Sequence, residues 1–599
     1  MRVRWLGRVP YREAWTVQRA MSSRSDHDYL LLLEHPHVYT LGTNGDPHHV
    51  LVEPASVGAE VIEVDRGGDV TYHGPGQLVC YPLISVGSGP HRGPEHVHRV
   101  EQVVIDALVA LGMPRSGVGR LPGYPGVWAG LDEDEPGLPG PRKICAIGVR
   151  TSRGRTTHGL ALNVHPDLSM FDHIVPCGIA DKPVTSLEAE GHHVTMAAAA
   201  DAIIASAQEA WGPVENIQRV TDGARADLVT VPGVTADPSG RAQGGAVGGE
   251  GGMEAIPVVL CRRPPVERAL DRRLRRSGVD PGAGLSLGER KPPWLRAKAH
   301  MGGDFLGLRH DLRDLDLATV CEEAGCPNIY ECWSDGTATF MINGSRCTRA
   351  CGFCQVDTRH PLPLDVGEPE RVAQAVGRMG LAHAVITCVA RDDLADGGAG
   401  GFAATIAAVR DRTPRTTVEV LISDCKGDQG SLDIIFGARP DVLNHNIETV
   451  ARLQRAVRPS AGYARSLGVL ARAKGAGLTT KSGIILGMGE HEDEVLATLS
   501  DLRAVGVDIV TVGQYLRPSS RHLPVARWWT PGEFGAIQRA GMAMGFAHVQ
   551  ASPLTRSSYH AREAAEASAP GRVSSGGPDA GSPPRVSTAP AQATAPVAP

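Results

Sequence analysis

The spacing of hydrophobic and polar positions divides the chain into two folded blocks. In residues 1–222, strand-like and helix-like runs follow one another without regular alternation. Tyr29 to Leu33 reads as a buried strand, and Ile144 to Arg150 with Thr156 to Val164 reads as a hairpin. A helix is indicated by hydrophobic residues at helical spacing, namely Val100, Val103, Val104, Ala107, Leu108 and Leu111. This block is therefore predicted to be an α+β sheet domain.

Residues 285–565 alternate regularly between strand-like and helix-like runs. The strand-like runs are Thr339–Ile342, Ala384–Val389, Val418–Ile422, Asp441–Ile447, Thr480–Leu486 and Asp508–Tyr515. Alternating β and α units are typical of a parallel sheet or barrel. We therefore predict a partial (β/α)6 barrel in this block, with its chemistry at the C-terminal ends of the strands.

Two segments contain too few large hydrophobic residues to form a core. Pro238 to Met253 is rich in glycine, and the end of the chain is mainly Pro, Ala, Ser and Gly. Such segments cannot bury enough surface to offset their ordering entropy. We predict a flexible linker over 223–284 and a disordered tail over 566–599, with two halves that fold independently. Seven arginines between Arg262 and Arg276 indicate a solvated helix face or a docking patch for an acidic carrier protein.

Composition narrows the classes of function. A net charge of −6 and 4% aromatic residues do not favour a nucleic-acid partner. The first residues contain no apolar run of the signal-peptide type, and no run approaches 18 apolar residues. We therefore expect a cytoplasmic protein without a membrane partner. Twelve cysteines in such a chain do not suggest disulfides.

Six of the cysteines are clustered between Cys321 and Cys354. Cys347, Cys351 and Cys354 form C-x3-C-x2-C directly after the first barrel-type strand. Three thiolates on one loop can bind three irons of a [4Fe–4S] cluster and leave the fourth iron open. A structural zinc site fits less well, because it uses four closed ligands, usually in C-x2-C pairs. The triplet resembles that of the radical S-adenosylmethionine (SAM) superfamily, in which SAM occupies the open iron.

A second set, C-x4-C-x5-C, lies just upstream at Cys321, Cys326 and Cys332. Together with the stretches Arg391-Asp392-Asp393, DGGA, DVLNHNIET, TKSG, GQYL, HLPV and RSSYHA, it resembles lipoyl synthase over about 290–563. The resemblance implies an auxiliary [4Fe–4S] cluster whose fourth ligand is a serine of RSSY, Ser558 or, as second choice, Ser557. It also implies radical insertion of sulfur at C6 and C8 of a protein-bound octanoyl chain.

Some residues at or near strand ends are candidates to bind SAM, although each is also a common turn or cap residue. They are Asp396, Gly397, Gly398, Asn446 and Glu448. The chain departs from the family pattern at Ala390 and around Ser423 to Cys425, where local packing and substrate contacts are expected to differ from those of the family. Cys388 and Cys425 read as small buried residues rather than ligands.

The first block contains a dense motif from Arg66 to Gln77, RGGDVTYHGPGQ. Its glycines permit a tight turn and close approach of the backbone to a ligand. With Lys143 in KICAIGV, HGLALN from His158 and Cys177 in IVPCGI, it resembles lipoyl(octanoyl) transferase, also called lipoate-protein ligase B, over about 28–190. That family has a biotin/lipoate ligase-like fold.

This second resemblance implies acyl transfer through Cys177. Lys143 would lower the pKa of the Cys177 thiol and move protons, because a nearby ammonium favours the thiolate. The donor would be octanoyl-acyl carrier protein, whose thioester is already activated. His73 would line the acyl pocket or act on protons. The residues implied to bind substrate are Arg66, Gly67, Gly68, Asp69, Val70, Thr71, Tyr72, His73, Ala146, Ile147, Gly148, Gly159, Leu160 and Ala161.

The two resemblances predict consecutive activities on one chain. The implied partners are the lipoyl domains of 2-oxoacid dehydrogenase complexes, the glycine cleavage H protein, a ferredoxin or flavodoxin, and an iron–sulfur carrier. The alternative is a single-activity protein whose other half only binds lipoyl domains. A different radical SAM sulfur-inserting enzyme is less favoured, because a transferase-like half is attached.

Overall fold

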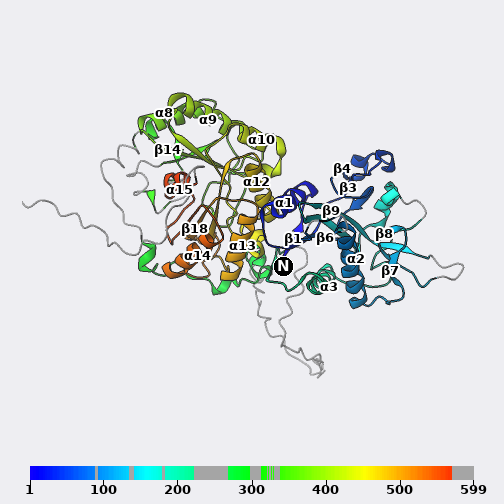
Figure 1. The fold of residues 1–599 in the computed structure, drawn as a ribbon. Helices are drawn as coiled ribbons and strands as arrows, with labels where there is room; N and C mark the ends of the chain where they lie inside the picture. The colour runs from blue at the N-terminus through cyan, green and yellow to red at the C-terminus, as the bar shows by residue number, and fades with distance from the viewer. Residues whose placement is uncertain are drawn as a thin grey trace, which may run out of the picture.

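The computed structural model describes residues 1–87, 89, 92–133, 140–178, 182–221, 268–296 and 338–568. Between 296 and 338 it describes residues 310, 312–319, 322, 326, 328 and 329. The described chain forms an N-terminal unit (1–221) and a C-terminal unit (268–568) that lie side by side (Figure 1). Most of the predicted linker and nearly all of the predicted tail lie outside these residues. No helix in the described part combines the length and apolarity needed to cross a bilayer.

The N-terminal unit is built on an eight-stranded mixed sheet. Its order is β11 (Asn216–Arg219), β1 (Arg2–Arg8), β2 (Tyr29–Glu34), β6 (Gln77–Leu83), β10 (Arg155–Asn163), β9 (Arg142–Ser152), β8 (Tyr124–Ala129) and β7 (Val118–Leu121). A smaller sheet has the order β4 (Glu60–Glu63), β3 (Val38–Leu41) and β5 (Val70–His73). The predicted hairpin is present as antiparallel β9 and β10. The α+β arrangement agrees with the prediction.

Burial on both faces explains why β2 contains only apolar residues before Glu34. Leu30 and Leu32 pack with α2 (Arg92–Ala110) and α3 (Met196–Trp211) on one side of the large sheet. Tyr29, Leu31 and Leu33 face the other side, where α1 (Tyr11–Arg24) lies. Side chains of a strand alternate between the two faces of the sheet, so an uninterrupted apolar run requires packing elements against both faces. The C-terminal unit also packs against this second face, as described below.

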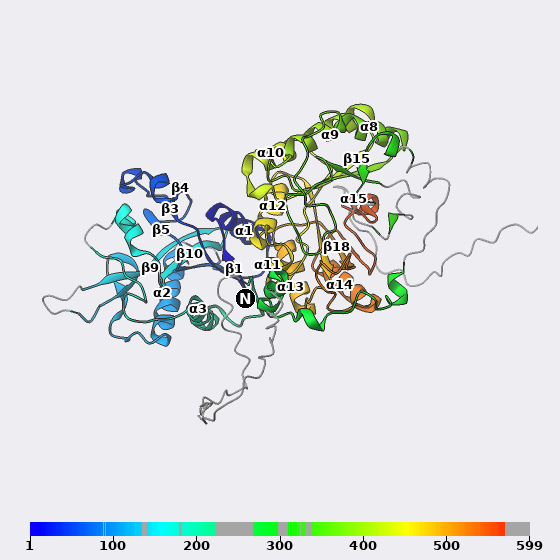
Figure 2. The ribbon, with the colours of Figure 1, turned by 180° about the vertical axis from the view of Figure 1, so that it is seen from behind.

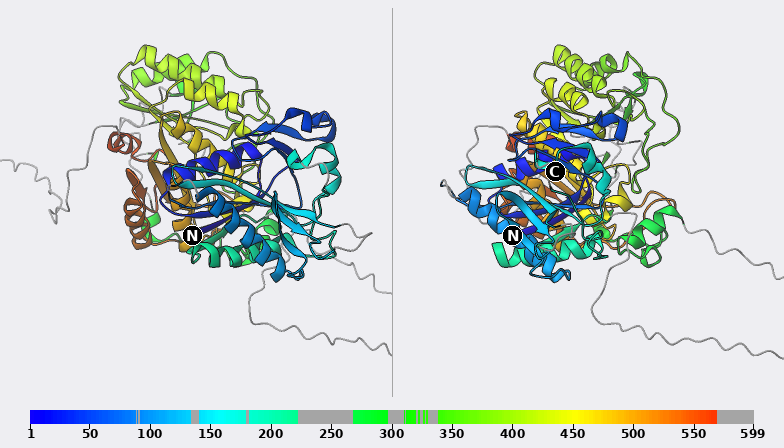
Figure 3. Two further views of the ribbon diagram at one scale, coloured as in Figure 1. Left: turned by 45° about the vertical axis from the view of Figure 1, so that its right-hand side comes forward. Right: turned by 90° about the vertical axis from the view of Figure 1, so that its right-hand side faces the viewer.

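The C-terminal unit is an open, curved sheet with helices on its outside (Figure 3). Seven parallel strands run in chain order: β13 (Thr339–Ile342), β14 (His383–Cys388), β15 (Thr417–Leu421), β16 (Val442–Asn444), β17 (Thr479–Leu486), β18 (Ile509–Gln514) and β19 (His548–Ala551). Antiparallel β12 (Ala318–Thr319) extends the β13 edge. The helices are α8 (Glu368–Arg378), α9 (Ala399–Arg412), α10 (Gln429–Gly437), α11 (Gln454–Val457), α12 (Tyr463–Gly475), α13 (Glu492–Ala504), α14 (Pro531–Ala543) and α15 (Ala561–Ala567).

The prediction of six parallel strands needs correction, because β19 is a seventh. Its sequence, HVQA, is short, and the partly exposed His548 and Gln550 alternate with buried Val549 and Ala551. At the edge of the sheet only one strand, β18, pairs with it. Such a short half-polar segment gives little hydrophobic signal in the sequence.

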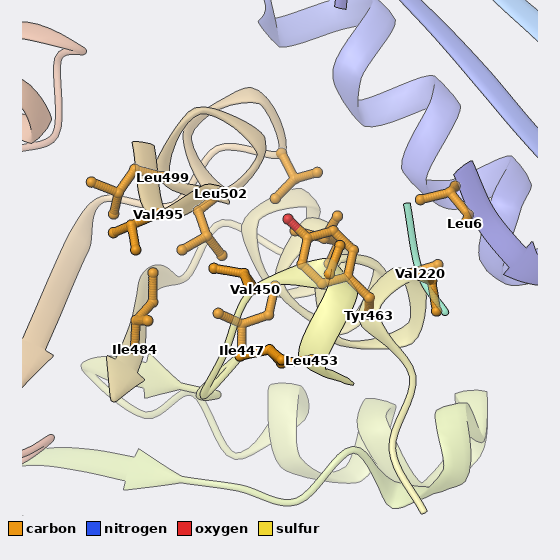
Figure 4. Packing of buried hydrophobic residues seen from close by; sticks show 14 of the residues in the cluster. Leu6, Val220, Ile447, Val450, Leu453, Tyr463, Ile484, Val495, Leu499 and Leu502 are labelled. Atoms are coloured by element: carbon orange, nitrogen blue, oxygen red, sulfur yellow. The ribbon is translucent and has the colours of Figure 1, made fainter. Parts of the chain in front are cut away.

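One hydrophobic core continues from the N-terminal unit into the C-terminal unit. Leu6 and Val220 pack in the same cluster as Leu453 and Tyr463 (Figure 4). Helix α1 contacts β6 and β10 on one side and α12 and α13 on the other. The view from behind shows the same neighbours (Figure 2). The prediction of two independently folding halves did not include this contact. The face of α1 and β1 that points away from the N-terminal sheet is buried against the C-terminal unit.

A buried ion pair crosses this interface. Arg4 Nε donates to both carboxylate oxygens of Asp501, at 2.8 and 2.7 Å, and Tyr463 donates to Asp501 at 2.9 Å. Both charged side chains are at most 1% exposed. Burial opposes the charge on Arg4, but Asp501 outweighs it and raises the pKa of the guanidinium. A charge pair of this kind fixes one arrangement of the two units, since either partner alone would be buried without compensation.

Replacing Arg4 with alanine is expected to destabilise the interface by about 3–5 kcal/mol, because Asp501 is left as an unpaired buried charge. The measurement is chemical denaturation of the full chain with separate probes for each unit. Arg539 on α14 is exposed and serves as the control, for which Arg539→Ala should change stability by less than about 0.5 kcal/mol. Equal effects of the two substitutions would show that the Arg4–Asp501 ion pair contributes nothing to stability.

Candidate functional site

In the N-terminal unit, the motif from Arg66 forms a turn that leads into β5. The Arg66 guanidinium is 6% exposed and donates to the Thr40 carbonyl at 2.6 Å and to the Gly67 carbonyl at 3.1 Å. A Cβ on Gly42 would lie 2.2 Å from the Gly68 carbonyl, so only glycine fits against this turn. The turn is therefore held rigidly by its own arginine.

The structure brings the three predicted substrate-binding segments together. Gly67 N donates to the Val149 carbonyl at 3.1 Å, which joins the turn to β9. Gly159, Leu160 and Ala161 of β10 pair with Gly148, Ile147 and Ala146 of β9. A Cβ on Gly148 would lie 2.9 Å from the Gly67 carbonyl, so this glycine permits the close approach.

His73 lies in a buried group of aromatic and polar side chains beneath the turn. Its ring is stacked 5.8 Å from that of Tyr11, and its Nδ1 lies 2.8 Å from Gln77 Oε1. Burial lowers the pKa of His73 well below its usual value, so the ring is neutral near pH 7. Of the two predicted roles, lining a pocket suits a buried neutral ring better than carrying protons to solvent.

Cys177 lies on a short turn, Pro176–Gly178, next to β5. Its backbone is left-handed (φ 57°) and its side chain is partly exposed. The turn faces Asp69, which binds His49, and a Cβ on Gly178 would lie 2.9 Å from Asp69 Oδ2. Arg66 is close enough to Cys177 for an electrostatic interaction. The sequence pattern did not single out His49, because it stands in a polar stretch without periodicity.

Among the described residues, no hydrogen bond joins Lys143 to Cys177. Its side chain is 5% exposed, and Nζ lies 5.0 Å from the centre of the Trp128 ring. Its backbone bridges to Val184, shortly after the turn that carries Cys177. The pairing of Lys143 with Cys177 therefore stays a prediction.

In the C-terminal unit, Cys347, Cys351 and Cys354 share the loop that follows β13. Backbone hydrogen bonds tie this loop to its surroundings, from Cys347 N to Asp357 O at 2.8 Å and from Gly352 N to Val457 O at 2.9 Å. His522 Nε2 lies 2.9 Å from the Cys354 carbonyl. The three thiols are thus held on one anchored loop. This loop follows the C-terminal end of β13, the edge of the sheet where the chemistry was predicted.

A buried ion network fixes the same loop to the neighbouring strand ends. Arg349 pairs with Asp392 after β14 and with Asp424 after β15, both at 2.7 Å. Burial alone would raise the pKa of Asp424, but Arg349 outweighs it and holds that pKa at about 2. Arg465 of α12 approaches Asp424 and donates to Glu13 of α1 at 2.7 Å. The cysteine loop is therefore linked to the N-terminal unit.

The raised pKa values of the Cys351 and Cys354 thiols are consistent with a site that binds positively charged iron. Burial raises the pKa of Cys351, and raises that of Cys354 to about 12. Nearby positive charge is needed to hold such thiols as thiolates, and irons supply it. No group of three His, Cys, Asp or Glu among the described residues converges on one metal-ion position. Thiolates that each bind a different iron of one cluster need not converge in this way.

Two predicted SAM-binding residues, Asn446 and Glu448, lie near the cysteine loop. Glu448 interacts electrostatically with Cys351 and Cys354 and has a left-handed backbone (φ 67°). In the described structure Asn446 Oδ1 and Glu448 Oε2 are buried and accept no hydrogen bond. Orphaned buried acceptors fit a ligand that donates hydrogen bonds, as an amino group does.

Asp396 caps the N-terminus of α9. Its carboxylate accepts hydrogen bonds from Gly398 N and Gly400 N, at 2.9 and 2.8 Å, at the start of α9. Gly397 and Gly398 have left-handed backbones (φ 61° and 88°) that form the turn. The carboxylate is thus engaged in capping, which was the other interpretation of this residue.

Of the upstream cysteines, Cys326 lies in the described part, and Cys321 and Cys332 lie outside it. Arg556 interacts electrostatically with Cys326, and Asn328 Nδ2 donates to the Leu554 carbonyl at 2.7 Å. The Cys326 loop is therefore next to the segment RSSY. Ser557 Oγ already accepts a hydrogen bond from Asn446 at 2.8 Å. Cys425 is buried, as predicted, whereas Cys388 is partly exposed.

Comparison with known proteins identifies both units. The model "Lipoyl protein ligase A/B catalytic domain" matches residues 10–208. The model "N-terminal domain of lipoyl synthase of Radical_SAM family" matches 283–326, and "Radical SAM superfamily" matches 341–502.

Curated relatives match about half of the chain at high identity. Lipoyl synthase of Rubrobacter xylanophilus is 56% identical over 278 residues, 46% of this chain and 87% of that protein. Lipoyl synthase of Mycobacterium avium is 54% identical over 285 residues, 47% of this chain and 93% of that protein. A solved bi-partite lipoate protein ligase from Thermoplasma acidophilum is 16% identical with a TM-score of 0.29, over 36% of this chain and 87% of that one.

Proposed function

The chain belongs to the lipoyl synthase family through its C-terminal unit, and we propose that it is bifunctional. Its N-terminal unit transfers octanoyl from an acyl carrier protein to a lysine of a lipoyl domain. Its C-terminal unit then inserts sulfur at C6 and C8 of that chain. The observation that carries the proposal is the presence of a lipoyl protein ligase A/B catalytic domain on the same chain, because the product of the first reaction is the substrate of the second.

Acyl transfer proceeds through Cys177 in this proposal. Its sulfur attacks the octanoyl thioester, and the carrier thiol leaves with a proton while the acyl-enzyme forms. The lysine amine of the lipoyl domain then attacks, an amide forms, and the Cys177 thiol is released. Lys143 moves the protons in both steps. The support is a partly exposed thiol on a turn with left-handed backbone, next to β5, whose residues are predicted to bind substrate.

Family membership implies SAM and iron–sulfur clusters as cofactors of the C-terminal unit. When bound, these groups supply the hydrogen-abstracting radical and the sulfur atoms. We propose that Cys347, Cys351 and Cys354 hold the cluster that binds SAM. Cys321, Cys326, Cys332 and Ser558 hold a second one. The free acceptors on Asn446 and Glu448 would orient SAM. A ferredoxin or flavodoxin would supply the electrons, and an iron–sulfur carrier would supply the clusters.

Replacing Ser558 with alanine is expected to remove the second cluster and to lower sulfur insertion at least about tenfold, because the fourth ligand is lost. Ser557→Ala is the matched control, since that hydroxyl is bound to Asn446. The measurements are iron content after reconstitution and lipoyl product. If Ser557→Ala lost the cluster and Ser558→Ala kept it, the ligand assignment would be reversed.

The proposed function is tested by giving the full chain octanoyl carrier protein, apo lipoyl domain, SAM and reductant. Mass spectrometry follows octanoylation and sulfur insertion as separate mass changes on the lipoyl domain.

A further inference from the structure

A cleft of about 1220 Å³ lies between the two units and is lined by both. On the N-terminal side its walls are α1 and the turn of the β9–β10 hairpin. On the C-terminal side they are α12 and the loop from Lys426 to Gln429. Figure 1 shows α1 next to α12 at this junction. Neither unit alone forms this surface, so it exists because the two are joined.

The cleft is strongly basic, although the chain has a net charge of −6. Nine basic side chains line it, against four carboxylates. Three of those carboxylates already pair with cleft arginines. In the described part of the chain, five of the basic side chains have no carboxylate within ion-pair distance; they are Arg19, Arg24, Arg153, Lys426 and Arg472. Unpaired positive charge in a concave surface attracts an acidic partner.

The cleft borders the loops that carry both candidate sites. Lys426 Nζ donates to the Asp392 carbonyl at 2.9 Å, and Asp392 pairs with Arg349 of the cysteine loop. On the other side, Asp65 and Arg150 line the cleft. Asp65 precedes Arg66 in the chain, and Arg150 follows Val149, whose carbonyl binds Gly67. One bound partner would therefore lie between the two sites.

We propose that this cleft docks an acidic face of the lipoyl domain, so that one surface serves both reactions. The proposal rests on the proposed function. Under that function the lipoyl domain is the one macromolecular substrate of both reactions, whereas the acyl carrier protein needs the N-terminal unit alone. A surface shared by both units and bordering both sites therefore suits the lipoyl domain. The arginine run near α4 (Ala269–Arg276) is less suitable, because Leu274 is buried and Arg268 pairs with Asp271.

The test uses the full chain and a purified apo lipoyl domain from a 2-oxoacid dehydrogenase complex. Arg19→Glu with Arg472→Glu reverses two unpaired cleft charges on α1 and α12. Arg153→Glu is a second variant, at the exposed turn of the β9–β10 hairpin. Arg539→Glu, on exposed α14 outside the cleft, is the control with the same change of charge per residue. Thermal unfolding checks that all variants are folded.

The cleft variants are expected to bind the lipoyl domain about tenfold more weakly at low ionic strength, and the difference should shrink in high salt. Octanoyl transfer and sulfur insertion should fall by a similar factor on the whole domain. Both should be unchanged on a short peptide bearing the target lysine, or its octanoylated form, because a peptide does not need the docking surface. Formation of the acyl-enzyme from octanoyl carrier protein should also be unchanged.

Two results would overturn the docking proposal. One is lipoyl-domain binding by the cleft variants equal to that of Arg539→Glu. The other is a loss confined to acyl-enzyme formation, which would make the cleft a site for the carrier protein. Failure of the wild-type chain to modify either the peptide or the domain would instead contradict the proposed function, so the two failures are distinguishable.

Discussion

Replacing Cys177 with serine is expected to abolish octanoyl transfer, by about a thousandfold or more, because a serine hydroxyl is not ionised near neutral pH and is a poor acyl acceptor here. The side chain is partly exposed on its turn, so the change should leave the fold intact. Sulfur insertion into a lipoyl domain that already carries octanoyl should proceed at the wild-type rate. Both reactions are followed by mass spectrometry of the lipoyl domain.

The second reaction is the internal control for folding, since the units share a core. A further control is mass spectrometry of the protein itself, which should show an octanoyl adduct on wild type and none on Cys177→Ser. Transfer at the wild-type rate by this variant would rule out the covalent mechanism. Loss of both reactions would show instead that the substitution disturbs the shared fold.

Replacing Cys347, Cys351 and Cys354 together by alanine is expected to remove SAM cleavage completely. A chain with two [4Fe–4S] clusters contains about eight irons, so this variant should retain about four. Replacing Cys321, Cys326 and Cys332 together should also leave about four irons, but SAM cleavage should continue without sulfur insertion. Iron analysis and the yield of 5′-deoxyadenosine measure the two effects.

Octanoyl transfer is the control for both triple variants and should be unchanged. Loss of SAM cleavage in the second variant, with its first cluster loaded, would contradict the division of labour between the clusters. If the reconstituted wild-type chain bound no iron, the C-terminal unit would be a binding module for lipoyl domains, and the single-activity alternative would hold.

The sequence predicted the elements of both units better than their assembly. Strong hydrophobic periodicity located the strands β13 to β18 and the β9–β10 hairpin to within a few residues. The short strand β19 was not predicted, because only two of its four residues are buried. As an edge strand it pairs with one neighbour, so fewer of its side chains need to be apolar. The predicted strand from Asp441 to Ile447 ends at Asn444, because the backbone turns there toward the left-handed Glu448.

The interface could not be predicted, although its residues were visible in the sequence. The apolar run from Tyr29 to Leu33 indicates a strand that is buried on both faces of its sheet. The hydrophobic pattern does not show which element packs against the second face. Arg4 and Asp501 are 497 positions apart, and each alone reads as an exposed charge. Charge pairs across an interface depend on where two surfaces meet, so local spacing carries no signal for them.

For the sites, motif spacing located the cysteines and the glycine-rich turn but not their supporting groups. Arg349 lies within the cysteine loop, yet its partners Asp392 and Asp424 follow two other strands. His49 beside Asp69 also depends on contacts between distant segments. These groups are set by the order of strands in the sheet, which becomes known once the chain is folded.

The central claim is that one chain carries out both reactions on the same lipoyl domain. Its most direct test is a single incubation of the reconstituted full chain with octanoyl carrier protein, apo lipoyl domain, SAM and reductant, sampled over time by intact-mass spectrometry. We expect the octanoylated domain to form first, and then to be replaced by the lipoylated domain, with no added transferase or synthase. Octanoylated domain that accumulates without conversion, or conversion of pre-octanoylated domain without any transfer from the carrier protein, would contradict the claim.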